Sequence, residues 1–232
     1  RLKIDQSFVH GVVTNPDDAA IVRAILAVGH SLGLEVIAEG VETAAQVEWL
    51  RRERCEQIQG FLFSPAVPAE EFEKMLRSHK RLDIASGPKP GEARTLLIVD
   101  DEPNVLAAVI RVLRGDGYRV LTAQNASEAL TLLALNTVQV VMSDHRMPLM
   151  TGAELLGKVK LLYPDTVRLL FSGYIEIDAL VDAVNRGAVY RFLLKPWEDD
   201  IMRENIREAF QYYWLTRKHG AEPAAVPVLE VA

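Results

Sequence analysis

Five short apolar runs, separated by stretches with helical periodicity, constrain the fold of the second half of the chain most strongly. The runs are rich in β-branched and aliphatic residues, as expected for strands that are buried on both faces. They are Leu96–Val99, Val120–Ala123, Val138–Met142, Val167–Phe171 and Tyr190–Leu194. Strands that alternate with helices form a parallel sheet with right-handed crossovers. The sequence therefore predicts an α/β fold with a five-stranded, doubly wound parallel sheet.

Residues with known preferences for helix ends indicate where the helices between these runs begin and stop. Pro103 suits the first turn of a helix, and Gly115 and Gly187 suit helix ends. The last stretch, Asp199–Leu215, starts with acidic residues and then repeats apolar residues at helical spacing. These apolar residues are Ile201, Ile206, Ala209, Phe210 and Tyr213. We therefore expect the domain to end in an amphipathic helix.

The first part of the chain repeats a strand followed by a helix three times. The predicted strands are Leu2–Ile4, Glu35–Ala38 and Gln57–Gln59, and the predicted helices are about Asp17–Leu32, Thr43–Arg54 and Glu70–Ser78. Three such units cannot close a barrel, and by themselves they leave sheet edges exposed.

A break in the apolar pattern separates the two parts. Residues 84–94, IASGPKPGEAR, contain Ser, Gly and two prolines, which interrupt regular structure. We therefore expect a first domain over residues 1–83, a linker over 84–94, a second domain over 95–216 and a flexible tail over 217–232. Because the chain starts at Arg1, inside a predicted strand, we also expect it to be a fragment of a longer protein.

Composition and charge narrow the class of protein. The formal net charge of −6, without a basic stripe, argues against nucleic-acid binding. The longest uncharged stretch, Ala129–Ser143, contains polar residues and is too short to cross a bilayer core of about 30 Å, so no membrane span is expected. Cys55 is the single cysteine of the sequence, which fits a reducing compartment and a cytoplasmic location.

Charged and polar residues follow four of the predicted strands at their carboxyl ends. Asp100 and Asp101 follow the first strand, and Asp144 follows the third. The carboxyl ends of neighbouring strands converge on one crevice, so three carboxylates can meet there. Such a cluster favours a hard divalent ion such as Mg²⁺, because like charges at close range raise one another's proton affinity. Ser172 after the fourth strand and Lys195 after the fifth add a hydroxyl and a cation.

These residues can surround a phosphoryl group, because a carboxylate that accepts one needs a metal, a counter-charge and a hydrogen-bond donor near the phosphoryl oxygens. The motifs VDDE, SDHRMP, FSG and FLLKP, in this order, resemble those of a response regulator receiver domain over about Thr95–Leu215. The resemblance implies a flavodoxin-like fold in a bacterial two-component system. It also implies Mg²⁺ as cofactor and a histidine kinase or phosphotransfer protein as phosphoryl donor.

The receiver resemblance assigns a role to each of these residues by its position. Asp144 is the expected phosphoacceptor, and Phe192 is the expected aromatic switch. Ser172 and Lys195 are expected to bind the phosphoryl oxygens. The expected Mg²⁺ ligands are Asp100, Asp101, Asp144 and the backbone carbonyl of Arg146. The signal is expected to leave through the fourth helix, the fifth strand and the last helix, with a homodimer through the receiver as a candidate assembly.

Each of these residues also has an ordinary structural alternative when it is taken singly. Asp100 and Asp101 would also cap a helix. Lys195 could lie on the surface, and Phe192 could belong to the core. Their combination at the strand ends favours the functional interpretation. His145 is expected to be exposed and not to bind the metal, because Mg²⁺ prefers oxygen ligands.

Three segments of the first part place polar residues at or just after strand ends, where barrel active sites are built. The segments LKID, EVIAEGVET and QGFLFSP resemble the last third of an EAL domain, a (β/α)8 phosphodiesterase that opens cyclic di-GMP with two divalent metals. The resemblance implies a partial (β/α)8 barrel of about three β-α units before the receiver. It maps Lys3, Glu39, Glu42 and Gln59 onto active-site positions. The counterpart of Glu39 is a candidate base for the attacking water, and that of Glu42 supports the adjacent loop.

The rest of the EAL active site has no counterpart in residues 1–83. The family's signature glutamate, the asparagine and glutamate on the following strands, and the DDFGTG acidic pair are missing. Two-metal activation of water cannot be assembled from the residues that remain, so this fragment is expected to be inactive as a hydrolase. Two interpretations stay open. Either the parent protein is a cyclic di-GMP phosphodiesterase that the receiver regulates, or the EAL remnant is a degenerate nucleotide- or protein-docking module.

Overall fold

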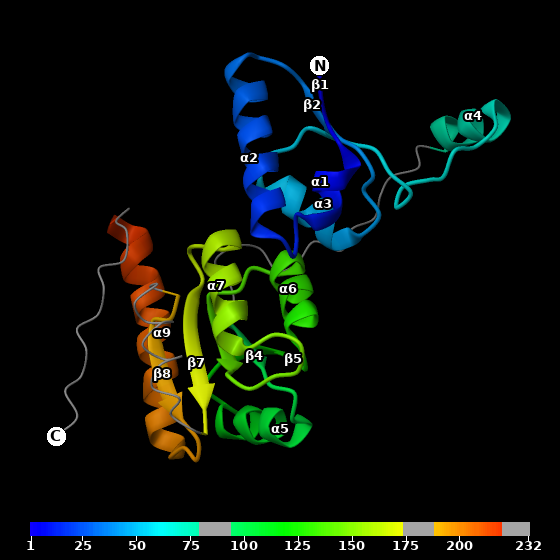
Figure 1. Cartoon of the computed structure of the whole chain (residues 1–232). Helices are drawn as coiled ribbons and strands as arrows, with labels where there is room; N and C mark the ends of the chain where they lie inside the picture. The colour runs from blue at the N-terminus through cyan, green and yellow to red at the C-terminus, as the bar shows by residue number, and fades with distance from the viewer. Residues whose placement is uncertain (79–93, 174–187, 220–232) are drawn as a thin grey trace. The chain divides into compact units, whose positions relative to one another are not determined.

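The computed structural model describes residues 1–78, 94–173 and 188–219 (Figure 1). The chain divides into two compact units, and each is described by itself. The predicted linker lies outside the described residues, except that Arg94 begins the first strand of the second unit. The last helix continues to His219, three residues past the predicted domain end at residue 216. The predicted tail from residue 220 onward lies outside the described residues.

The second unit is built on a parallel sheet of five strands. The strands are β4 (Arg94–Val99), β5 (Tyr118–Ala123), β6 (Val140–Asp144), β7 (Val167–Ser172) and β8 (Arg191–Leu194). They lie in the order β5-β4-β6-β7-β8, so that β6 is the central strand. This is the flavodoxin-like strand order, and the prediction of a five-stranded, doubly wound parallel sheet is confirmed.

The described helices of the second unit are α5 (Pro103–Val112), α6 (Ala126–Leu135), α7 (Gly152–Leu162) and α9 (Asp199–His219). As predicted, Pro103 occupies the first turn of α5. Gly115 follows this helix with a φ of 97°, a left-handed conformation that glycine adopts without a Cβ clash. Gly187 and the predicted fourth helix lie outside the described residues.

Side chains on both faces of the five-stranded sheet are buried. On one face, α5 and α9 pack against the strands through a continuous core, which includes Ile98, Met142, Leu169, Phe171 and Phe210. On the other face, Leu97, Val141 and Leu170 are also buried, and α7 contacts β6 and β7. Burial on both faces explains why these strands appear in the sequence as nearly continuous apolar runs.

The first unit contains a parallel sheet of three strands in the order β1-β2-β3. Its strands β1 (Leu2–Ile4), β2 (Val36–Ala38) and β3 (Gln57–Ile58) alternate with α2 (Pro16–Ser31), α3 (Ala44–Arg52) and α4 (Ala69–Arg77). The predicted threefold repeat of strand and helix is confirmed. The sheet is a partial one, with β1 and β3 at its edges among the described residues.

The sequence pattern does not predict one helix of the first unit, α1 (Gln6–Gly11). This helix is too short to show an apolar period. It begins after Asp5, whose side chain accepts a hydrogen bond from the backbone N–H of Ser7 at 2.9 Å. An aspartate at this capping position is the signal that could have identified the helix.

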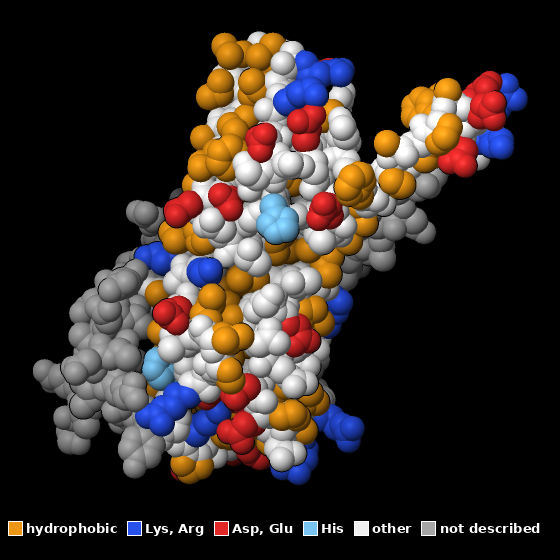
Figure 2. Space-filling view, turned by 45° about the vertical axis from the view of Figure 1, so that its right-hand side comes forward, with side chains coloured by type: hydrophobic (Ala, Val, Ile, Leu, Met, Phe, Trp, Pro, Cys, Tyr) orange, Lys and Arg blue, Asp and Glu red, His pale blue; other side chains and the backbone are white. Residues whose placement is uncertain are grey.

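Helix α4 buries none of its residues. Its apolar side chains Phe72 and Leu76 are exposed, and Glu70, Glu71 and Lys74 lie on the same helix. Figure 2 shows apolar side chains beside acidic and basic ones on the segment that carries α4. Within the described ranges, none of the helices combines the length and the apolar character needed to cross a membrane.

Candidate functional site

Four parallel strands of the second unit bring polar residues to one edge of the sheet. Strands β4, β6, β7 and β8 pair in parallel, so the residues at or just after their carboxyl ends come together. These residues are Asp100, Asp144, Ser172 and Lys195. The structure thus places the predicted site residues of the four motifs at the same edge.

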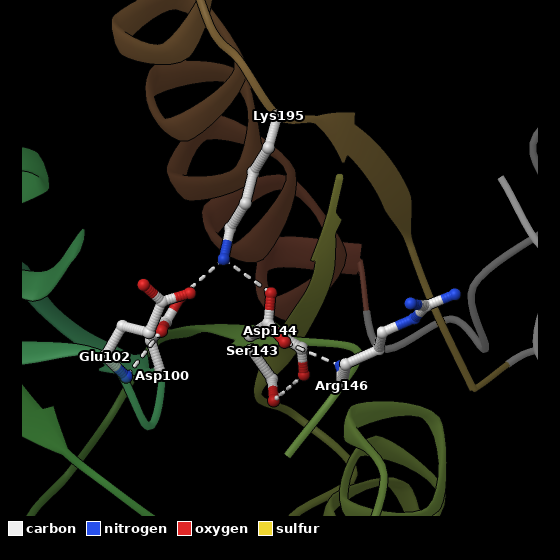
Figure 3. A network of polar contacts seen from close by, with 6 residues as sticks. All are labelled: Asp100, Glu102, Ser143, Asp144, Arg146 and Lys195. Carbon is white, nitrogen blue, oxygen red and sulfur yellow. Dashed lines mark hydrogen bonds and ion pairs between the residues drawn. The ribbon is translucent and has the colours of Figure 1, made fainter. Parts of the chain in front are cut away.

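Lys195 connects two buried carboxylates at this edge (Figure 3). Its Nζ lies 2.7 Å from Asp100 Oδ2 and 2.6 Å from Asp144 Oδ1. The side chains of Asp100 and Asp144 are 1% and 9% exposed, and that of Lys195 is 18% exposed. Burial alone would lower the pKa of Lys195, but its hydrogen bonds to Asp100 and Asp144 outweigh burial and raise the pKa. Lys195 is therefore charged at neutral pH and pairs with both carboxylates.

Backbone N–H groups hold the second oxygen of each carboxylate. Asp100 Oδ1 accepts a hydrogen bond from the Glu102 N–H at 2.9 Å, and Asp144 Oδ2 accepts one from the Arg146 N–H at 2.6 Å (Figure 3). The Ser143 hydroxyl donates to the backbone carbonyl of Asp144 at 2.9 Å. Hydrogen bonds to ionised groups are short and strong, so they orient both carboxylates before any ligand binds.

The other predicted receiver residues lie around this network. Ser172 ends β7 and is buried. Asp101 and Arg146 are exposed, and Phe192 is partly buried in β8. The structure thus brings Asp100, Asp144 and Lys195 into direct contact. The roles expected of Asp101, Arg146, Ser172 and Phe192 stay predictions.

The magnesium site also stays a prediction. Among residues 1–78, 94–173 and 188–219, no three His, Cys, Asp or Glu side chains form a group arranged to hold a metal ion. The charge of the site does fit a cation, because two buried carboxylates share one ammonium and keep one net negative charge. Carboxylate and carbonyl oxygens are also the ligands that Mg²⁺ prefers.

His145 is buried, so the expectation that it is exposed is wrong. The residue is 8% exposed. Its backbone N–H donates to the Phe171 carbonyl at 2.9 Å, and its own carbonyl accepts a hydrogen bond from the Gly152 N–H at 2.9 Å. The first bond extends the pairing of β6 with β7, and the second folds the following loop back onto the start of α7. A polar side chain at the end of an apolar run gives no sign of this backbone pairing.

Two aromatic residues next to the network have no role assigned from the sequence. The ring of Phe171 has its centroid 4.8 Å from Lys195 Nζ. The ring of Trp197 has its centroid 5.2 Å from that of Phe171. Phe171 directly precedes Ser172 in the FSG motif, and Trp197 follows Lys195 by two residues. These positions next to motif residues are the signal that could have identified the pair.

In the first unit, two of the predicted EAL residues form an ion pair. Lys3 Nζ lies 2.6 Å from Glu39 Oε1, between the ends of β1 and β2. The side chain of Lys3 is 62% exposed and that of Glu39 is 30% exposed. Because solvent screens exposed pairs, this contact adds little to stability.

The other two predicted EAL residues flank this ion pair through their backbone. The N–H of Glu42 donates to Gln46 Oε1 at 2.8 Å, and the Glu42 side chain is exposed. Gln59 donates its N–H to the Ala38 carbonyl at 2.8 Å, just beyond β3. The structure therefore joins Lys3 to Glu39 and anchors Glu42 and Gln59 near them.

Comparison with known proteins gives two family matches. The family model of the EAL domain matches residues 1–66, and that of the response regulator receiver domain matches residues 96–207. A solved structure, the signal receiver domain of an HD domain-containing protein from Pseudomonas fluorescens Pf-5, is similar with 31% identity and a TM-score of 0.52. The match covers 53% of this chain and 99% of that chain.

Two curated proteins illustrate the longer relatives of the chain. The hydrogenase transcriptional regulatory protein HoxA of Bradyrhizobium diazoefficiens is 39% identical over 134 residues, which are 58% of this chain and 27% of HoxA. The bifunctional diguanylate cyclase/cyclic di-GMP phosphodiesterase MucR of Pseudomonas aeruginosa is 51% identical over 71 residues, which are 31% of this chain and 10% of MucR. The chain therefore spans about a quarter or less of the length of these relatives.

Proposed function

Because the chain belongs to the response regulator receiver family over residues 96–207 and to the EAL domain family over residues 1–66, we propose that it is a two-component response regulator. Asp144 accepts a phosphoryl group from a histidine kinase or a phosphotransfer protein. This modification switches the output of the attached EAL part, which acts on cyclic di-GMP in the parent protein. We place the protein in the cytoplasm, in line with its single unpaired thiol at Cys55.

In the proposed transfer, an Asp144 carboxylate oxygen attacks the phosphorus of a phosphohistidine. The O–P bond forms as the P–N bond breaks, and the departing imidazole nitrogen takes up a proton. The Lys195 ammonium and the Ser172 hydroxyl bind the phosphoryl oxygens and offset their negative charge. Mg²⁺ would add charge neutralisation when held by Asp100, Asp101, Asp144 and the Arg146 carbonyl.

The contact of one lysine with two buried carboxylates carries this proposal. Lys195 is 95 residues from Asp100 and 51 residues from Asp144 in the sequence, yet it donates to both. A helix-capping role would account for the bond from the Glu102 N–H to Asp100, but not for the ammonium beside it. Buried ion pairs add little net stability because desolvation opposes them, so a function is the better explanation of this arrangement.

Labelling of Asp144 tests the proposal. Wild-type protein incubated with phosphoramidate and Mg²⁺ is expected to gain one phosphoryl group, measured by intact mass. Asp144→Asn is expected to gain none, because the amide is not a phosphoacceptor. Asp200→Asn is a matched control, since the Asp200 side chain is 97% exposed, and it is expected to be labelled like the wild type. Equal labelling of Asp144→Asn would show that the acceptor is another residue.

For the output, we propose regulation of a cyclic di-GMP phosphodiesterase over a docking role. A degenerate docking module is the second candidate, favoured by the ion pair that engages the Glu39 carboxylate with Lys3. The coding sequence upstream of Arg1 separates the two. The missing acidic motifs of the EAL active site would support the enzyme, whereas a start codon close by would support the remnant.

We propose that the signal leaves the receiver through Phe192 and α9. A phosphoryl group on Asp144 draws the Ser172 hydroxyl inward, and the space it vacates admits the Phe192 ring. Strand β8 and helix α9 expose apolar side chains that suit a homodimer or docking on the EAL part: Leu194, Ile201, Trp214 and Leu215. The fourth helix, also expected to take part, lies outside the described residues.

A further inference from the structure

We propose that Phe171 is a positioning residue for Lys195. Its aromatic ring attracts the Lys195 ammonium and keeps it between Asp100 and Asp144 while the phosphoryl group is transferred. The inference rests on the proposed phosphotransfer to Asp144. It adds to that site an aromatic partner of the lysine that neither the motifs nor the family matches assign.

The Phe171 ring and the Lys195 ammonium are close enough to attract each other. Nζ lies 4.8 Å from the ring centroid, and a cation is attracted to an aromatic face within about 6 Å of its centroid. The Phe171 side chain is 1% exposed, and that of Lys195 is mostly buried. Because water is largely excluded from both partners, the contact belongs to the stronger, desolvated class of cation–π interactions.

Neighbouring contacts fix the ring in this place. The Phe171 carbonyl accepts a hydrogen bond from the His145 N–H at 2.9 Å, and the Lys195 N–H donates to the Ser172 carbonyl at 2.8 Å. The Trp197 ring packs against that of Phe171 with an interplanar angle of 55°. The backbone bonds hold Phe171 in the strand ladder, and Trp197 limits the rotation of its side chain.

A ring face suits an ammonium that has to change hydrogen-bond partners. Lys195 has three N–H donors and uses them on Asp100 and Asp144. After the transfer, one Asp144 oxygen bridges to phosphorus, so Lys195 redirects a donor to a phosphoryl oxygen. Attraction to an aromatic face does not depend on the direction of one N–H bond, so it persists during this exchange. An aliphatic side chain would fill the same space without attracting the charge.

Phe171 also belongs to the apolar core, so its replacement lowers stability whatever its role at the site. Phe210 provides a matched control for that effect. It belongs to the same core, is 3% exposed, and stacks on Tyr118 with ring centroids 4.9 Å apart. Tyr118 begins β5, at the opposite end of the parallel strands from Lys195. Phe171→Leu and Phe210→Leu therefore make the same change in one core, but only the first removes a ring from the ammonium.

An NMR measurement on the whole chain tests the contact without relying on phosphorylation. The probe is the ε-methylene signal of Lys195, identified by its loss in Lys195→Arg. In the wild type this signal is expected upfield of the other lysine signals, because an aromatic ring shields nuclei above its face. The upfield shift is expected to persist in Phe210→Leu and to vanish in Phe171→Leu. An unshifted Lys195 signal in the wild type would overturn the proposal.

The rate of labelling by phosphoramidate with Mg²⁺ tests the consequence for the site. Phe171→Leu is expected to slow it by between about 2-fold and about 30-fold, the range set by measured cation–π free energies. Phe210→Leu is expected to change it by less than about 2-fold. Phe171→Tyr keeps an aromatic ring and is expected to retain most of the rate. In a Lys195→Met background, Phe171→Leu is expected to have no further effect, because no ammonium remains to be held.

Two results would overturn the positioning role even if Asp144 is the phosphoacceptor. One is an equal loss of rate in Phe171→Leu and Phe210→Leu. The other is the same effect of Phe171→Leu with and without Lys195. Equal labelling of the wild type and Asp144→Asn would instead remove the proposed function, and the NMR shift would then decide the Phe171–Lys195 contact by itself.

Discussion

Gly152 lies against the backbone carbonyl of Asp144 so closely that a Cβ atom at residue 152 would come within 1.9 Å of the Asp144 oxygen. Real Cβ atoms essentially never approach another heavy atom to less than 3.0 Å. The first residue of α7 therefore has to be glycine if the phosphoacceptor backbone is to keep its place. The geometry of the acidic network thus depends on a residue without a side chain.

We expect Gly152→Ala to displace Asp144 and to lower the free energy of unfolding by about 1–3 kcal/mol, the usual cost of overpacking. Labelling by phosphoramidate is expected to slow, because the Asp144 carboxylate moves relative to Lys195. Gly157→Ala, in the same helix, is the control, since a Cβ there meets no atom within 4 Å. It is expected to raise the free energy of unfolding by up to about 1 kcal/mol. Urea unfolding and intact mass check both variants, and a Gly152→Ala protein that matches the wild type in both would contradict the close contact.

Lys195 is expected to make stability depend on alkaline pH. Burial alone would lower its pKa, but the hydrogen bonds to Asp100 and Asp144 raise the pKa above the ordinary value of 10.5. The folded state then holds this proton more tightly than the unfolded state. The resulting stability is complete below pH 10.5 and is lost as the pH rises through the higher folded pKa.

The measurement is the difference in the free energy of unfolding between the wild type and Lys195→Met, followed by urea unfolding from about pH 8 to about pH 12. The difference is expected to shrink above pH 10.5, because the wild type alone loses the contribution of a charged Lys195. Lys160→Met replaces an exposed lysine and is expected to show no such change. A constant difference for Lys195→Met across this range would mean that the ammonium does not stabilise the folded state.

The chain is expected not to hydrolyse cyclic di-GMP with Mg²⁺ or Mn²⁺. Most metal ligands of an EAL active site have no counterpart in residues 1–83, and the Lys3–Glu39 pair alone cannot hold two metals. Chromatographic detection of the linear product checks this, with Glu39→Ala as the control for background. Turnover that Glu39→Ala abolishes would mean that more of the active site is present than the sequence indicates. Binding without turnover would favour the docking module.

Phosphorylation is expected to change the association of the chain or the hydrogen exchange of Phe192–Tyr213. A phosphoryl group must bind the inward state of Ser172 more tightly by a few kcal/mol to make that state dominant. Sedimentation and hydrogen exchange with and without a phosphoryl mimic measure the response. Phe192→Ala is expected to abolish it, and Phe192→Tyr, which keeps a ring, is expected to retain it. If neither observable responds to the mimic in the wild type, the proposed signalling route is wrong.

The strands of the second unit are predictable because burial on both faces leaves an apolar signal at each position. The largest difference is in β6, which was expected at Val138–Met142 and runs over Val140–Asp144. At its start, the Gln139 side chain accepts a hydrogen bond from the Thr95 N–H at 2.7 Å, so a side chain takes part in joining the two chains there. At its end, Asp144 pairs with Phe171 and remains in the ladder. Polar residues at the ends of a strand carry no apolar signal for either change.

The order of the motifs predicts which residues reach the site, but not how their side chains pack. Strand order alone brings Asp100, Asp144 and Lys195 to one edge, and the structure adds the distances between them. The burial of His145 and the contact of Phe171 with Lys195 depend on how a loop and a ring fold over that edge. Such contacts have no pattern in the sequence, because they join residues that no periodicity connects.

The 95 residues between Asp100 and Lys195 also have a consequence for biosynthesis. A nascent chain that ends before residue 195 carries both carboxylates without their shared ammonium. Strand β8 lies at the edge of the sheet and is the last strand made, so the counter-charge arrives only when translation of the domain is nearly complete. We therefore expect a truncated or half-synthesised receiver to be silent toward its phosphoryl donor, which protects the signalling pathway from unfinished copies of its own switch.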